Sequence, residues 1–160
     1  MSSTVRNRPP SPSSRPSLVR TLFNRPSLIT SRGVRLAVYA LIVIGAVLTV
    51  LSGLLHLKLW NGPPPYRLVP TIGPLFLLQA ISAVALGLIL LVTQRLFFVL
   101  ACFGLMVGTA LGLYLSVHVG LFGFQDSFGA PYATSSFVLE LIGAGVLLIA
   151  AIPLALARKR

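Results

Sequence analysis

Four long apolar stretches constrain the fold of this chain more than any other feature. They cover about residues 34–60, 72–92, 96–120 and 135–157. Each is close to or above the roughly 20 residues that an α-helix needs to cross a bilayer. Inside lipid, only helices and closed barrels satisfy all of their backbone polar groups. The sequence therefore predicts an all-α integral membrane protein, in which residues 34–160 form an antiparallel four-helix bundle.

Composition and missing motifs exclude several classes of protein. The chain has 160 residues, of which 56% are hydrophobic and 9% charged, so it has too little charge for the surface of a soluble domain. The single cysteine, Cys102, excludes an internal disulfide and any paired-cysteine redox or zinc motif. A GxSxG elbow, a phosphate-binding loop and paired carboxylates are absent from the sequence. We therefore expect a non-enzymatic protein.

Residues 1–33 are rich in arginine, serine and proline, and they have no apolar run of the length of a signal peptide. This composition predicts a disordered basic tail on the cytoplasmic side. The tail is either simply solvated or bound to anionic lipid, since arginines near an anionic leaflet favour membrane contact. Nucleic acid is not the expected partner. The arginines are Arg6, Arg8, Arg15, Arg20, Arg25 and Arg32.

Each apolar stretch contains one strongly polar residue. These are His56, Gln79, His118 and Glu140. Counted from the helix ends at about 1.5 Å per residue, the four should lie within one slab of the membrane. Small residues share the helical face of most of them, so the polar groups should point into the bundle. Tyr114, one turn before His118, could hydrogen-bond to it.

Three interpretations of this polar layer remain open. In the first, Glu140 pairs with a histidine and the cluster is structural, since ionisable groups inside membranes usually pair with one another. In the second, the layer binds a proton, a metal ion or a small ligand, although the spacing carries no metal signature. In the third, His56 and His118 ligate a haem or contact a quinone. No cofactor is predicted outright.

Small residues recur at every fourth position of the third stretch, at Gly104, Gly108, Gly112 and Ser116. Overlapping GxxxG units let helices approach closely. The stripe predicts helix packing, either within the bundle or between copies in a homo-oligomer.

Positive charges set the expected orientation. The tail, Arg95 and the C-terminal Arg-Lys-Arg lie on one side of the bundle, and only Lys58 and Arg67 lie near the other. The positive-inside rule then places both termini in the cytoplasm. The polar layer would lie in the outer leaflet of a plasma membrane.

The segment that begins at His56 reads HLKLWNGPPPYRLVPTIGPLFLLQ. It resembles a group of small four-span membrane proteins of high-GC Gram-positive (actinobacterial) type. The resemblance covers about the last four-fifths of the chain and implies a multi-pass plasma-membrane protein. No activity is established for that group, so the resemblance assigns no functional residue. The matching residues are His56, Trp60, Tyr66, Pro70, Ile72, Gly73, Leu75, Phe76 and Gln79.

Two functions compete on these observations. The first is an accessory or scaffolding component that contacts a membrane-protein partner. The alternative is a small transporter, or a protein that binds a ligand, metal or proton through the outer-leaflet polar layer.

Overall fold

The computed structural model describes residues 18–63 and 65–157, and it confirms the all-helical four-span fold. Its long helices are α2 (Arg32–Asn61), α3 (Ile72–Thr93), α4 (Leu96–His118) and α5 (Ala133–Leu156). The shortest of them, α3, has 22 residues. At 1.5 Å per residue it extends about 33 Å, which is enough for a hydrocarbon core of about 30 Å. All of them are apolar enough to cross a membrane.

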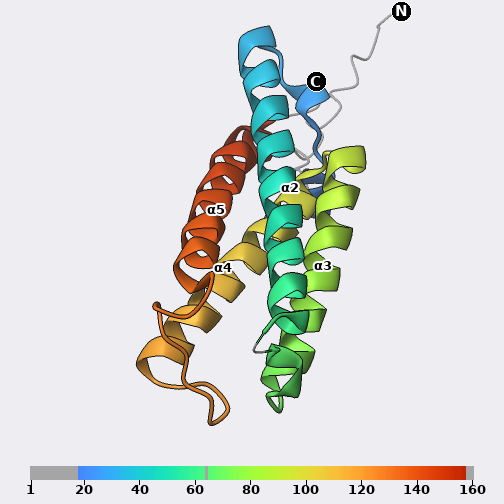
Figure 1. Cartoon of the computed structure of the whole chain (residues 1–160). Helices are drawn as coiled ribbons and strands as arrows, with labels where there is room; N and C mark the ends of the chain where they lie inside the picture. The colour runs from blue at the N-terminus through green and yellow to red at the C-terminus, as the bar shows by residue number, and fades with distance from the viewer. Residues whose placement is uncertain (1–17, 64, 158–160) are drawn as a thin grey trace, which may run out of the picture.

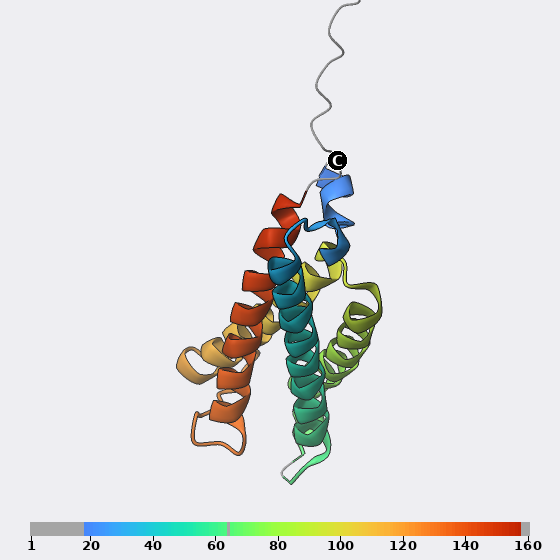
Figure 2. The ribbon, with the colours of Figure 1, turned by 90° about the horizontal axis from the view of Figure 1, so that it is seen from above.

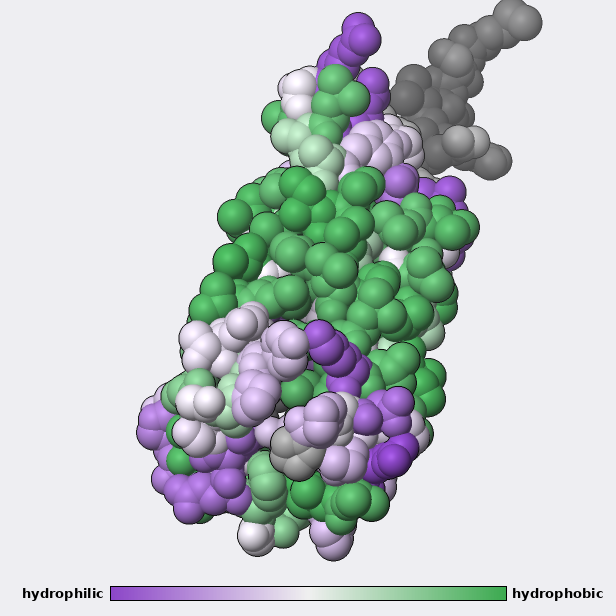
Figure 3. Space-filling view, viewed as in Figure 1, coloured by the Kyte–Doolittle hydropathy of each residue, from purple (hydrophilic) through white to green (hydrophobic). Residues whose placement is uncertain are grey.

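The helices run antiparallel, with α2 between α3 and α5 and with α4 packed on α5 (Figures 1 and 2). One end carries the start of α2, the α3–α4 connection and the end of α5, and we call it the terminal end. The opposite, loop end carries the α2–α3 connection, with the 3-10 turn η2 (Tyr66–Leu68), and the α4–α5 loop. An apolar band separates the polar residues of the two ends (Figure 3).

Helices α2 and α3 make the closest contact of the bundle. A Cβ atom on Gly53 would lie 2.9 Å from the carbonyl oxygen of Ala80, and one on Gly87 would lie 3.0 Å from that of Ala46. The two backbones can approach this closely because these positions lack side chains.

The N-terminal segment differs from its prediction. Residues 18–31 are structured, with α1 (Leu18–Leu22) and the 3-10 turn η1 (Pro26–Leu28), although the sequence predicted disorder throughout residues 1–33. The reason is Asn24, which is buried. Its side-chain amide donates to the carbonyl oxygens of Leu154 (2.9 Å) and Ala157 (2.8 Å), at the end of α5. Its own carbonyl accepts from the backbone N–H of Leu96 at the start of α4 (3.0 Å). Residues 1–17 lie outside the described part of the chain.

Helices α3 and α4 meet at the terminal end and diverge toward the loop end (Figures 1 and 2). The connection is short, and Gln94 turns the chain in a left-handed conformation at the end of α3 (φ 51°). Because the helices separate beyond this turn, the bundle is not closed along its full length.

Candidate functional site

A partly open cavity of about 420 Å³ lies in the loop half of the bundle, between α3, α4 and α5. Helix α2, the η2 turn and the α4–α5 loop also contribute to its walls. Most of the wall is apolar, with a few polar groups, which is typical of small-molecule sites. The lining residues used below are Tyr66, Leu75, Phe76, Leu78, Gln79, Gly108, Gly112, Ser116, Phe124, Asp126, Ser136, Glu140 and His56.

Glu140 of α5 is the most buried polar residue of this wall, with 1% of its surface exposed. Its Oε1 atom accepts hydrogen bonds from the hydroxyls of Ser52 and Ser136, both at 3.2 Å. Its Oε2 atom has no hydrogen-bond partner. Thr109 lies close by, but it donates its only hydroxyl proton to the carbonyl oxygen of Leu105 (2.8 Å). One carboxyl oxygen therefore stays without a bond.

His56 faces the same carboxyl group from α2. Its Nε2 atom lies 3.8 Å from Glu140 Oε1, and its Nδ1 atom lies 2.9 Å from the carbonyl oxygen of Ser52. Because a carbonyl oxygen can only accept, Nδ1 carries a proton. The Nε2 atom then carries either a lone pair or a second N–H that is directed toward Glu140. The His56–Glu140 pair can therefore hold one further proton, either on the imidazole or on the carboxyl group.

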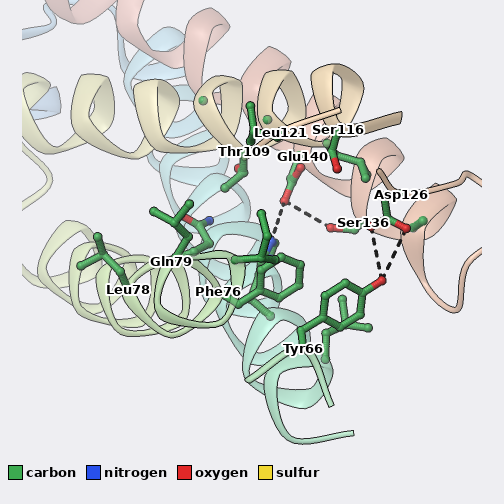
Figure 4. Close-up of a pocket in the computed structure, with 18 of the residues that line it drawn as sticks. Tyr66, Phe76, Leu78, Gln79, Thr109, Ser116, Leu121, Asp126, Ser136 and Glu140 are labelled. Carbon is green, nitrogen blue, oxygen red and sulfur yellow. Dashed lines mark hydrogen bonds and ion pairs between the residues drawn. The ribbon is translucent and has the colours of Figure 1, made fainter. Parts of the chain in front are cut away.

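Two further buried polar atoms of the wall lack partners. They are Nε2 of Gln79 on α3 and Oγ of Ser116 on α4, in side chains that are 7% and 5% exposed. Figure 4 shows Gln79, Ser116 and Glu140 around one space. The residues of the wall therefore include a buried amide donor, a hydroxyl and a carboxyl oxygen that have no partners in the described part of the chain.

The glycines of the α4 stripe meet no other helix among the described residues, contrary to the predicted packing within the bundle, whereas packing between copies of the chain stays a prediction. A Cβ on Gly104, Gly108 or Gly112 would meet no atom within 4 Å. Instead, Gly108, Gly112 and Ser116 line the cavity. The divergence of α3 from α4 is the physical reason, because it leaves this face of α4 without a neighbour.

Exposed lining residues mark the mouth of the cavity between α3 and α4. Leu75 and Leu78 are 40% and 60% exposed, and Gly108 on the facing helix is also exposed. Leu78 lies about 9 Å from the start of α3, and Gly108 about 15 Å from the end of α4. The mouth therefore opens along the sides of the membrane-spanning helices.

An aromatic and acidic cluster forms the loop end of the cavity. The ring of Tyr66 stacks on Phe76 at 4.7 Å and meets the edge of Phe124 at 5.9 Å. Its hydroxyl donates to the Asp126 carboxylate, with its oxygen 3.3 Å from Oδ2. Burial and the nearby negative charge of Asp126 raise the pKa of Tyr66 to about 12. The polar layer predicted from the sequence does not include Asp126. Its being the only other acid in the chain was a signal that could have drawn attention to it.

The structure places His118 and Tyr114 outside the polar layer. Both are exposed, and neither lines the cavity. Their rings stack at 4.1 Å, and His118 Nδ1 bonds to the backbone carbonyl oxygen of Tyr114 rather than to its hydroxyl. His118 follows the buried Ser116 by two residues, or about 200° around the helix, so it points away from the cavity. Gln79, His56 and Glu140 are brought together as expected, but His118 is not.

The two histidines suggested as metal or haem ligands do not share the cavity. In residues 18–63 and 65–157, no group of three His, Cys, Asp or Glu side chains could hold a metal ion. His56 lines the cavity and His118 does not, so the suggested pair of axial ligands shares no cavity.

Comparisons with protein-family models, curated proteins and solved structures find no match for this chain. The resemblance to four-span actinobacterial membrane proteins therefore stays a prediction.

Proposed function

We propose that this multi-pass protein of the plasma membrane binds a small amphipathic molecule in the cavity between α3, α4 and α5. One observation carries the proposal. Gln79 Nε2, Ser116 Oγ and Glu140 Oε2 are buried polar atoms without partners, and all three residues line the same cavity. A ligand with an apolar body and a polar group would match both the wall and these atoms.

The energetics favour an occupied cavity. Each buried polar group without a partner costs about 1–3 kcal/mol, and groups inside lipid find no water to replace the missing bond. A polar ligand group that contacts these atoms removes part of this cost. The leucines and aromatic rings of the wall favour an apolar body, at roughly 25 cal/mol per Å² of apolar surface removed from water.

The position of the mouth favours entry from the lipid. Leu78 and Gly108 lie on the sides of α3 and α4, about 9 Å and 15 Å inside the helix ends at the loop end of the bundle. An amphipathic molecule already concentrates in the membrane. It would therefore reach the cavity laterally, through the gap that Gly108 leaves open.

A scaffolding role, in which a partner helix packs on the glycine stripe, predicts a different result from ligand binding when Gly104 and Gly108 are mutated. A partner helix on the stripe would contact Gly104 and Gly108 alike, whereas a ligand in the cavity contacts Gly108 and not Gly104, because only Gly108 lines it. A Cβ atom at either position would have no atom within 4 Å, so both positions have open space beside the backbone of the isolated chain. Gly104→Leu and Gly108→Leu are therefore a matched pair of variants.

The test measures energy transfer from Trp60, the only tryptophan, to dansyl probes that carry a pentyl chain ending in an alcohol or in an amine. In the purified wild-type protein we expect saturable transfer with at least one probe. Gly108→Leu should weaken this binding about tenfold by filling the mouth, which is about 1.4 kcal/mol, and Gly104→Leu should leave it unchanged.

Two results would contradict the proposal. The first is the absence of saturable transfer with either probe. The second is an equal effect of the two leucine variants, together with a loss of self-association, which would favour helix packing on the stripe.

A further inference from the structure

The charge of the cavity identifies the class of ligand. We infer that the cavity takes a lipophilic cation, meaning an apolar molecule that carries a protonated amine. The inference rests on the proposed function and adds the sign of the ligand's charge. The chain has only two acidic residues among its 160, Asp126 and Glu140, and both line this cavity.

One oxygen of the Glu140 carboxyl group, Oε2, has no hydrogen-bond partner among the described residues. Ser52 and Ser136 both donate to Oε1, and His56 Nε2 also lies nearest to Oε1. All of these partners leave Oε2 without a bond. An ammonium N–H is the donor that a carboxylate oxygen binds most strongly, and a low dielectric strengthens that bond.

Among the described residues, the basic side chain beside this carboxyl group is His56, whose Nε2 lies 3.8 Å from Oε1. None of the described residues that line the cavity is a lysine or an arginine. The two basic residues near the loop end have other partners. Lys58 donates to the hydroxyl of Tyr132 (2.8 Å), and Arg67 donates to the side-chain oxygen of Asn61 (2.7 Å). Within residues 18–63 and 65–157, the carboxyl group of Glu140 therefore has no lysine or arginine partner, although the chain is strongly basic.

The rest of the wall suits a cation with an apolar body. Phe76 and Phe124 line the cavity, and aromatic faces attract cations by about 0.5–2 kcal/mol. Asp126 adds a second carboxyl group at the loop end. An anionic ligand would face both carboxyl groups and no lining lysine or arginine, so the wall selects against it.

The experiment compares three dansyl probes that differ only at the end of the pentyl chain, which carries an amine, an alcohol or a carboxylate. In the wild-type protein we expect the amine to bind about tenfold more tightly than the alcohol, which is about 1.4 kcal/mol. The carboxylate should bind most weakly. Glu140→Gln keeps the size of the side chain and an acceptor for Ser52 and Ser136, and it should reduce the preference for the amine to about twofold or less.

A second variant, Asp126→Asn, keeps the experiment decisive if Glu140→Gln does not fold. It should reduce the preference for the amine by a smaller factor, because Asp126 lies at the loop end and already accepts from Tyr66. Equal binding of amine and alcohol by the wild-type protein would overturn the inference of a cation while leaving the proposed function intact. Saturable binding of neither probe would overturn the proposed function itself.

Discussion

At the scale of single residues, the loop end of the cavity depends on Tyr66. Its ring lies between Phe76 and Phe124, and its hydroxyl donates to Asp126. The phenol can hold this position only while it is protonated, because a phenolate would face the carboxylate as a like charge. The protonation of Tyr66 therefore reports directly on the intact cluster.

We predict that one of the four tyrosines ionises near pH 12 in the folded protein, well above the usual pKa of 10. The pKa of Tyr66 is higher in the folded protein than in the unfolded chain. The contribution of the protonated phenol to the free energy of unfolding is therefore complete below pH 10. It is lost as the pH rises from 10 to about 12. Ultraviolet titration should show this late ionisation in the wild-type protein and not in Tyr66→Phe.

Asp126→Asn supplies the control for this titration. It removes the negative charge while burial of the ring persists, so the pKa of Tyr66 should fall only part of the way toward 10. An unchanged titration in both variants would show that Tyr66 does not sit against Asp126.

At the scale of helices, glycines serve two opposite purposes in this protein. Gly53 and Gly87 let α2 and α3 touch backbone to backbone. Gly104, Gly108 and Gly112 leave one face of α4 uncovered, and the last two of them shape the cavity. The same residue type therefore closes one helix pair and opens another, depending on whether a neighbouring helix is present.

This contrast predicts that alanine in place of Gly53 and alanine in place of Gly104 affect the free energy of unfolding differently. In Gly53→Ala the new Cβ would lie 2.9 Å from the Ala80 carbonyl oxygen and 3.0 Å from the Ala83 Cβ, so the helices must separate. We expect the free energy of unfolding to fall by about 1–3 kcal/mol. Gly104→Ala meets no atom within 4 Å and should be neutral, or stabilising by up to about 1 kcal/mol. Unfolding of each variant in mixed detergent micelles, followed by circular dichroism, measures both. A loss of similar size in both variants would contradict the open face of α4.

At the scale of the whole molecule, the two ends of the bundle differ in their charged residues. At the terminal end, Asn24 forms hydrogen bonds both with the start of α4 and with the end of α5. The loop end holds both acidic residues and the cavity. Under the predicted orientation the terminal end faces the cytoplasm, because most of the described arginines lie there.

Cysteine labelling tests this orientation. In a Cys102→Ala background, Gly129→Cys lies in the exposed α4–α5 loop and Ser27→Cys in the exposed part of the N-terminal segment. A membrane-impermeant maleimide should label Gly129→Cys in intact spheroplasts, and Ser27→Cys only after the membrane is opened. The reverse pattern would place the termini outside the cell.

The sequence could predict the buried faces of three helices, but not that of α4. His56, Gln79 and Glu140 share helical faces with small residues, and all three are buried. On α4 the every-fourth-residue stripe looked like a packing face, yet it lines a cavity, and His118 beside it is exposed. In a membrane, residues that face lipid are as apolar as those that face helices, so hydropathy alone cannot tell the two faces apart.

By itself, the sequence determined that the chain forms four apolar helices with polar residues inside them, because length and hydropathy leave few alternatives in lipid. Only the tertiary structure decided which polar residues meet. The divergence of α3 from α4 opens the cavity, and the α4–α5 loop brings Asp126 to the same wall as Glu140. Both depend on helix angles and on contacts between residues far apart in the chain, such as Asn24 with Leu154, which no local sequence pattern encodes.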